Sequence, residues 1–194
     1  MIFSLKDTTE NELFIVLASA ANIRNKNIEV VKAAIENDYY IIVVTTNQLA
    51  GILKKNYDKQ MLPEDKIYFV DAVTKYAAGT NVPPMKNCRF ITNPGNLTDM
   101  GIAITESIKE LEGKKTCLLL DSINSMLIYI PSHNITKFIH FVTNKLRIHN
   151  LSGIFLIVEK GIAPEVLSQL TTFVDNVIDE DPVPDKVMPV SGKV

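Results

Sequence analysis

Hydrophobic residues along the chain fall into short continuous runs that alternate with segments of helical spacing. The runs are rich in β-branched and aromatic residues, which predicts strands buried on both faces of a sheet. The predicted strands are 13–17, 39–44, 66–70, 88–91, 116–120, 154–158 and 173–178. The predicted helices are 28–36, 48–57, 100–111, 135–149 and 164–171. Thr98 is the predicted N-cap of the helix over 100–111.

This alternation predicts an α/β fold, in which a mostly parallel sheet is covered by helices on both faces. The arrangement has three layers, α/β/α. A domain is expected over residues 1–178. The tail, 179–194, contains three prolines and several charges and is predicted to be irregular. Adjacent prolines and a lack of periodicity predict a loop over 74–86.

Composition narrows the class of protein. A chain of 194 residues suits one compact domain. The 20 basic and 22 acidic side chains leave a net charge of -2, which argues against a dedicated nucleic-acid binder. The apolar runs are shorter than the roughly 20 residues that cross a bilayer, and the N-terminus does not resemble a secretory signal. Cys88 and Cys117 suggest no disulfide framework, so we expect a cytoplasmic protein without a membrane span.

The segment after the first strand has the position of a phosphate-binding loop. In a P-loop, GxxxxGK[ST], backbone amides surround the phosphates, the lysine meets the outer phosphates and the hydroxyl binds magnesium. Lys26 stands at the lysine position of this pattern. Ala20 and Asn25 stand at the two glycine positions, however, and Asn27 replaces the hydroxyl. Since a Cβ crowds a backbone that often needs positive φ, we expect phosphate wrapping and hydrolysis to be impaired.

Two interpretations of this segment stay open: an ordinary connection with a solvated Lys26, or a site with residual nucleotide binding. Asp121 and Ser122 bear on the choice because they follow a central strand, at the edge where ligands bind in open sheets. Such an aspartate can hold a magnesium-bound water, or it can cap a helix. The candidate nucleotide-binding residues are Ala20, Asn25, Lys26, Asn27, Asp121 and Ser122, and Asp121 is also the candidate catalytic residue and magnesium ligand.

Several segments together resemble archaeal RecA-superfamily proteins of the KaiC-like group. They are 116–129, 138–141 and 153–158, with 43–47, 69–74 and 93–98 similar to a branch whose members often lack an intact P-loop. The resemblance covers most of the chain and implies a RecA-like domain. It also implies a glutamate after the second strand in active relatives, where Thr45, Thr46, Asn47 and Gln48 offer no carboxylate.

The resemblance favours a catalytically impaired domain, a pseudo-ATPase, that acts through a protein partner or self-association in signalling or in regulation of an assembly. The alternative is a divergent ATP-binding protein or ATPase that uses Lys26, Asp121, ATP and Mg²⁺. Association with DNA, a third reading, fits poorly with the near-neutral charge.

Other chemistries have less support in the sequence. His133, His140 and His149 form no metal-ligand pattern with the cysteines, and Ser122 lacks the flanking glycines of a nucleophile elbow. Basic residues on the longest predicted helix are interpreted as a solvated face rather than a nucleic-acid contact. They are Lys137, Lys145 and Arg147.

Overall fold

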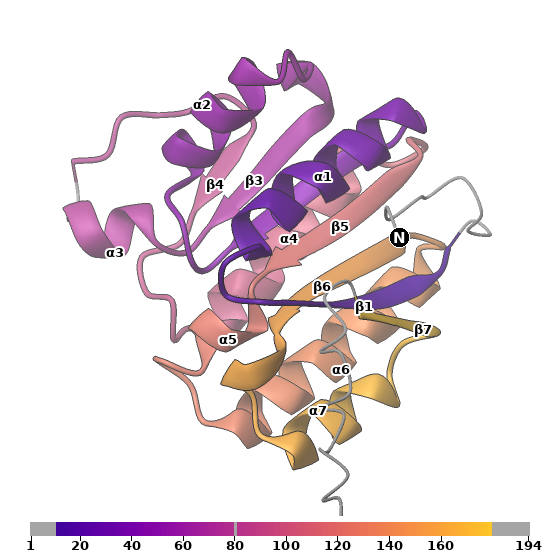
Figure 1. The fold of residues 1–194 in the computed structure, drawn as a ribbon. Coiled ribbons are helices and arrows are strands. Elements are labelled where there is room, and N and C mark those ends of the chain that lie inside the picture. Colours follow the sequence, from indigo (N-terminus) through magenta and orange to yellow (C-terminus); the bar gives the residue numbers. More distant parts are fainter. Residues whose placement is uncertain (1–10, 80, 180–194) are drawn as a thin grey trace, which may run out of the picture.

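The computed structural model describes residues 11–79 and 81–179, which form a three-layer α/β/α domain (Figure 1). Its central sheet has seven strands, all parallel, in the order β4-β3-β2-β5-β6-β1-β7. The strands are β1 Leu13–Ala18, β2 Tyr40–Thr45, β3 Ile67–Asp71, β4 Cys88–Phe90, β5 Thr116–Asp121, β6 Ser152–Val158 and β7 Asn176–Asp179. The predicted fold class is therefore confirmed.

Helices connect successive strands and cover both faces of the sheet. They are α1 Ile23–Glu36, α2 Ala50–Lys59, α3 Thr74–Ala78, α4 Leu97–Glu110, α5 Ile123–Met126, α6 Ser132–Ile148 and α7 Pro164–Thr171, with short 3-10 helices at Glu64–Lys66 and Glu159–Gly161. In the described part of the chain, no helix combines the length and apolar character that a membrane crossing requires.

The order of the strands determines which face each helix covers. From β1 to β4 the chain moves along the sheet in one direction, and after β4 it returns toward β5, β6 and β7. Because parallel crossovers are right-handed, this reversal places α1 and α2 on one face and α4, α6 and α7 on the other. Two buried hydrophobic clusters, one on each side of the sheet, match this division.

The strand register brings the carboxyl ends of β2, β3 and β5 together in the middle of the sheet. Thr45, the last residue of β2, pairs with Asp71 of β3 on one side and with Asp121 of β5 on the other. Polar residues that end neighbouring strands therefore meet at one edge, which is where open α/β sheets bind ligands.

Three local predictions were wrong, and one short helix was missed. The first helix starts at Ile23 rather than at residue 28, because Ile23 and Asn27 continue the buried face formed by Val30 and Ala34. The 74–86 segment contains α3, whose first amides are held by the Asp71 carboxylate.

The third wrong prediction and the missed helix concern elements on the opposite face. The side chain of Asn96, rather than Thr98, caps α4 by accepting a hydrogen bond from the Asp99 amide at 3.1 Å. The helix α5 is too short to show periodicity in the sequence. The predicted irregular tail lies outside the described residues, apart from Asp179, which ends β7.

Candidate functional site

Asp121, at the end of the central strand β5, is joined to two helices by a buried polar chain. Asn27 of α1 donates from Nδ2 to Asp121 Oδ2 at 2.8 Å, and the Tyr57 hydroxyl of α2 donates to Asn27 Oδ1 at 2.5 Å. None of the three side chains is more than 1% exposed. We call these three residues the Asp121 cluster. It connects α1, α2 and β5 beneath the carboxyl edge of the sheet.

The electrostatics of the Asp121 cluster are those of a carboxyl group removed from water. Burial raises the pKa of Asp121 to about 6, and the hydrogen bond from Asn27 opposes this rise. Burial, together with the charge of Asp121, also raises the pKa of Tyr57 far above its usual value. Asp121 Oδ1 is buried and has no hydrogen-bond partner among the residues described. One carboxylate oxygen is thus engaged, and the other is not.

The connection where a phosphate-binding loop was expected is a tight turn. The amides of Asn22 and Ile23 both donate to the Ser19 carbonyl at 3.0 Å, and the Lys26 amide donates to the Asn22 carbonyl at 2.9 Å. Of the candidate phosphate-binding residues, only Ala20 lies in this turn, since Asn25, Lys26 and Asn27 belong to α1. The amides of Asn22, Ile23 and Lys26, at the end of the connection and in the first turn of α1, therefore bond to backbone carbonyls.

Lys26, the residue that kept the P-loop spacing, pairs with a carboxylate of its own helix. Its Nζ lies 2.7 Å from Glu29 Oε2, and its side chain is 13% exposed. Ser122, the remaining candidate, is buried and is the N-cap of α5, with its amide 3.4 Å from Ser125 Oγ. The structure thus brings Asn27 and Asp121 into contact, while Lys26 has an ion pair outside the Asp121 cluster.

Several polar residues of this edge were missed by the sequence reasoning. Tyr57 was assigned only as a helix end, although its place opposite Asn27 makes it part of the Asp121 cluster. Thr46, which follows β2 where the family resemblance implies a glutamate, is buried, and its Oγ1 lies 2.7 Å from Ser125 Oγ and 3.0 Å from the Ser122 carbonyl oxygen. In the sequence these residues stand beside apolar ones, so the sequence pattern did not indicate their polar contacts.

Asp71 provides a contrast at the same edge. Its Oδ2 accepts from the Ala50 amide at 2.8 Å, and its Oδ1 accepts from the Val73 and Thr74 amides at 2.7 and 2.8 Å. Both oxygens are therefore used to anchor α2 and α3. Asp71 has the structural role that strand-end carboxylates often have, whereas Asp121 keeps one oxygen without a partner.

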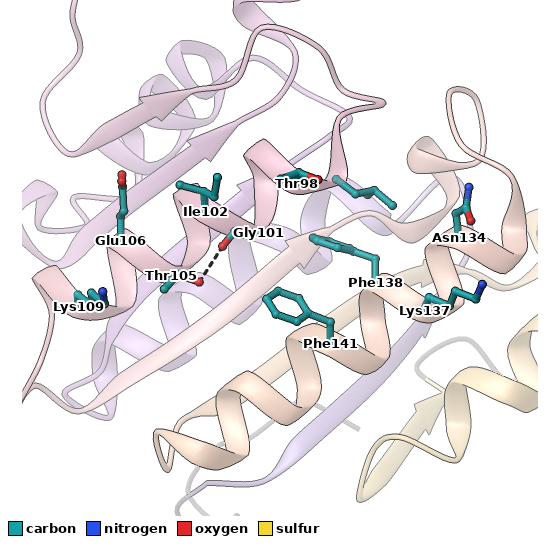
Figure 2. Close-up of a pocket in the computed structure, with 11 residues that line it drawn as sticks. Thr98, Gly101, Ile102, Thr105, Glu106, Lys109, Asn134, Lys137, Phe138 and Phe141 are labelled. Carbon is teal, nitrogen blue, oxygen red and sulfur yellow. Dashed lines mark hydrogen bonds between the residues drawn. The ribbon is translucent and has the colours of Figure 1, made fainter.

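A second candidate site lies on the other face of the sheet, between α4 and α6 (Figure 2). This hollow, the α4/α6 groove, has a volume of about 650 Å³. Its lining residues are Leu97, Thr98, Gly101, Ile102, Thr105, Glu106 and Lys109 from α4, and Asn134, Lys137, Phe138 and Phe141 from α6. Ile102 is 53% exposed and Phe141 is 46% exposed, so large apolar side chains face solvent there.

No group of three or more His, Cys, Asp or Glu side chains in the described part of the chain is arranged to hold a metal ion. Cys88 and Cys117 are both unbridged thiols. Burial raises the pKa of each to about 12, so neither is a reactive thiolate at neutral pH.

Comparison with known proteins identifies relatives of the sequence and of the fold. A model of the family of unknown function DUF7504 matches residues 17–180, whereas a search of curated proteins finds no significant match. The KaiC-like protein PH0186 from the hyperthermophilic archaeon Pyrococcus horikoshii OT3 superposes with a TM-score of 0.64 and 17% identity, over 88% of this chain and 72% of that chain. The uncharacterized protein PH0321 from Pyrococcus horikoshii, in complex with an unknown peptide, superposes with a TM-score of 0.66 and 10% identity, over 89% and 78%.

Proposed function

The chain belongs to the family of unknown function DUF7504 and has a RecA/KaiC-like fold, and from this premise we propose that it is a pseudo-ATPase domain that acts through protein partners. The proposal has two parts. The first is that the domain does not use ATP and Mg²⁺. The second is that it works by binding other proteins, in signalling or in regulation of an assembly.

The observation that carries the first part is the hydrogen bond from Asn27 Nδ2 to Asp121 Oδ2. In P-loop ATPases the strand-end aspartate serves the magnesium ion, which a Ser or Thr hydroxyl of the loop also binds. Here the residue at the hydroxyl position donates to that aspartate, and Tyr57 holds the amide in place from the other side. A cation that bound Asp121 through both carboxylate oxygens would have to displace this buried hydrogen bond.

The backbone of the connection adds independent support. Phosphate binding at a P-loop depends on several amides that point at the anion. The amides of Asn22, Ile23 and Lys26 point at backbone carbonyls instead, and the Lys26 ammonium group pairs with Glu29. A triphosphate therefore finds neither a cradle of these amides nor an uncompensated lysine charge, and ATP with Mg²⁺ does not fit the residues present.

The second part, action through protein partners, is supported by the exposed apolar surface of the α4/α6 groove and by the peptide bound to PH0321. Exposed apolar patches rimmed by polar residues commonly mark sites of protein interaction. PH0321, which shares the fold of this chain, is in complex with an unknown peptide, and this supports a protein or peptide as the partner here.

A divergent ATP-binding protein or ATPase is the competing function, and one observation favours it. Asp121 Oδ1 is buried without a partner among the residues described, so a ligand that reached it would gain an unsatisfied acceptor. In this alternative Asp121 would order Mg²⁺ and Lys26 would meet the phosphates after leaving Glu29.

Titration with a fluorescent ATP analogue in the presence of Mg²⁺ separates the two functions. We expect no saturable binding up to about 1 mM nucleotide, which corresponds to about 4 kcal/mol or less of binding free energy. Micromolar binding that is lost in Lys26→Ala and in Asp121→Asn, but kept in Lys55→Ala, would overturn the first part of the proposal. Lys55 is the matched control because it is an exposed lysine of α2, outside the β1–α1 connection and the Asp121 cluster.

A further inference from the structure

We propose that the α4/α6 groove binds an amphipathic helix whose ends carry acidic residues. This inference rests on the second part of the proposed function, and it names the surface and the chemistry of the partner. It does not depend on the Asp121 cluster, which lies at the carboxyl end of β5 and contributes no residue to the groove.

The shape of the α4/α6 groove suits a helix. On the α4 wall, Thr98, Gly101, Thr105 and Lys109 follow one another at intervals of three or four residues. They span about 17 Å of helix at 1.5 Å per residue. The opposite wall is built from Phe138 and Phe141, whose rings point from α6 toward α4 (Figure 2). A helix of about three turns laid along the groove would pack its apolar face against both walls, as helices do in other hydrophobic grooves.

Gly101 lets the aromatic wall of α6 approach α4 closely at the centre of the groove. A Cβ at this position would lie 3.3 Å from Phe141 Cε1 and 3.8 Å from the nearest Phe138 atom. The absence of this side chain lets the ring of Phe141 rest against the α4 backbone. Both aromatic rings therefore lie beside α4 at the middle of the groove, with Ile102 exposed on the neighbouring surface.

The polar groups of the walls do not suit a small polar ligand. Thr105 Oγ1 already donates to the Gly101 carbonyl at 2.8 Å, and Glu106 Oε2 accepts from Arg89 Nη1 at 3.0 Å. Small-molecule sites usually contain a few polar groups that converge on the ligand and fix its orientation. Here the middle of the groove offers mainly apolar contact, which favours a larger apolar surface as the occupant.

Charge selects an acidic partner over a basic one. Glu106, the only acidic lining residue, is paired with Arg89. Lys109 and Lys137 have no carboxylate partner among the residues that the structure describes. The two lysines lie at opposite ends of the groove and on opposite walls (Figure 2). Carboxylates near both ends of a docked helix would meet these charges, which gives specificity for an acidic partner.

The test uses two synthetic, fluorescently labelled peptides of roughly 16 residues, about 24 Å long as helices. Both carry leucines at i, i+3, i+4 and i+7 spacing, and they differ only in having glutamates or lysines near their ends. Binding to the full chain is measured by fluorescence anisotropy. Amide chemical shifts of the protein then locate the bound peptide.

We expect the glutamate peptide to bind at least about tenfold more tightly than the lysine peptide, with shifts concentrated on α4 and α6. Ile102→Glu should weaken binding of the glutamate peptide by at least about tenfold. Charge reversal in the Lys109→Glu/Lys137→Glu double variant should reverse the preference between the peptides. Ile52→Glu and Lys55→Glu, on the exposed surface of α2, are the matched controls and should leave binding unchanged.

Four results would overturn the inference. The first is the absence of saturation by the glutamate peptide up to about 1 mM. The second is equal binding of both peptides. The third is a dimer in sedimentation experiments that Ile102→Glu dissociates, because a second copy of the chain would then be the occupant. The fourth is peptide binding with chemical-shift changes away from α4 and α6. This result would show that the groove is not the binding site, but it would leave protein binding as the function. Micromolar ATP binding would count only against the pseudo-ATPase part.

Discussion

The Asp121 cluster and the α4/α6 groove differ in where they place their polar and apolar groups. The Asp121 cluster buries a carboxylate, an amide and a phenol, each no more than 1% exposed. The groove does the opposite, since it exposes Ile102 and Phe141 to solvent. The first arrangement is closed to solvent, with one Asp121 oxygen hydrogen-bonded and the other without a partner among the described residues, and the second has an apolar surface that nothing in the described chain covers.

The two regions differ in the free energy that their polar and apolar groups cost the fold. Burying polar groups costs free energy unless each finds a partner, and Asn27 supplies that partner from the position where a P-loop carries its magnesium hydroxyl. Exposing large apolar groups also costs free energy, which binding of another apolar surface would recover. The Asp121 cluster is therefore part of the folded core, whereas the opposite face exposes an apolar surface, the one proposed above as a site of association.

The largest effect is expected from removing the centre of the Asp121 cluster. Asn27→Ala leaves Asp121 Oδ2 and the Tyr57 hydroxyl buried without their partner, which should lower the free energy of unfolding by about 3 kcal/mol at neutral pH. Urea denaturation measures the loss. The control is Asn25→Ala, an exposed residue of the same helix, which should change stability by less than about 0.5 kcal/mol. Equal effects of the two substitutions would show that the Asp121 cluster does not stabilise the fold.

A second effect of similar origin concerns pH. The pKa of Asp121 is raised from 3.8 to about 6 in the folded state, so its contribution to stability is complete below pH 3.8 and is lost as the pH rises through about 6. The free energy of unfolding should fall by about 3 kcal/mol over this range relative to Asp121→Asn, which does not titrate.

Comparison of the two proteins at each pH separates Asp121 from the other carboxylates. The chemical shift of its carboxyl carbon reports the pKa directly. A midpoint near 4, with parallel stability curves for the two proteins, would mean that the carboxyl group is solvated, and the description of the Asp121 cluster as closed would fail.

Much of the fold could be predicted from the sequence because buried parallel strands are continuous apolar runs. The predicted range 116–120 differs from β5 only at Asp121, and 164–171 coincides with α7. The start of α1 could not be predicted because Asn27 takes a core position on the helix while being polar. Its burial depends on Asp121, which is 94 residues away, and on Tyr57 of α2.

The candidate sites were predicted less completely, for the same reason. Spacing identified Asn27 and Asp121 separately, but their contact depends on the register of β2 and β5 and on the packing of α1. The α4/α6 groove was missed because Phe141 continues the apolar spacing of its helix, which predicts a buried position. The structure leaves Phe141 46% exposed, at the surface between α4 and α6.

A smaller effect tests the packing at the centre of the α4/α6 groove. Gly101→Ala should gain helix propensity of about 1 kcal/mol, but the new Cβ, 3.3 Å from Phe141 Cε1, must displace the ring. We expect a net gain of about 0.5 kcal/mol in thermal denaturation. Gly51→Ala is the control, since a Cβ at Gly51 meets no atom within 4 Å, and it should show a larger gain. A larger gain at Gly101 would mean that Phe141 does not rest against the α4 backbone.

The smallest effect on stability is expected from Ile102→Glu, and this prediction separates folding from association. Ile102 is 53% exposed, so its replacement removes little buried area and should change the free energy of unfolding by less than about 0.5 kcal/mol. Ile52→Glu, at a site 46% exposed on α2, should behave alike in denaturation. The two variants should differ only in peptide binding. If Ile102→Glu instead cost more than about 1 kcal/mol, the side chain would belong to the packing of the domain. The α4/α6 groove would then be a feature of the fold rather than a surface for association.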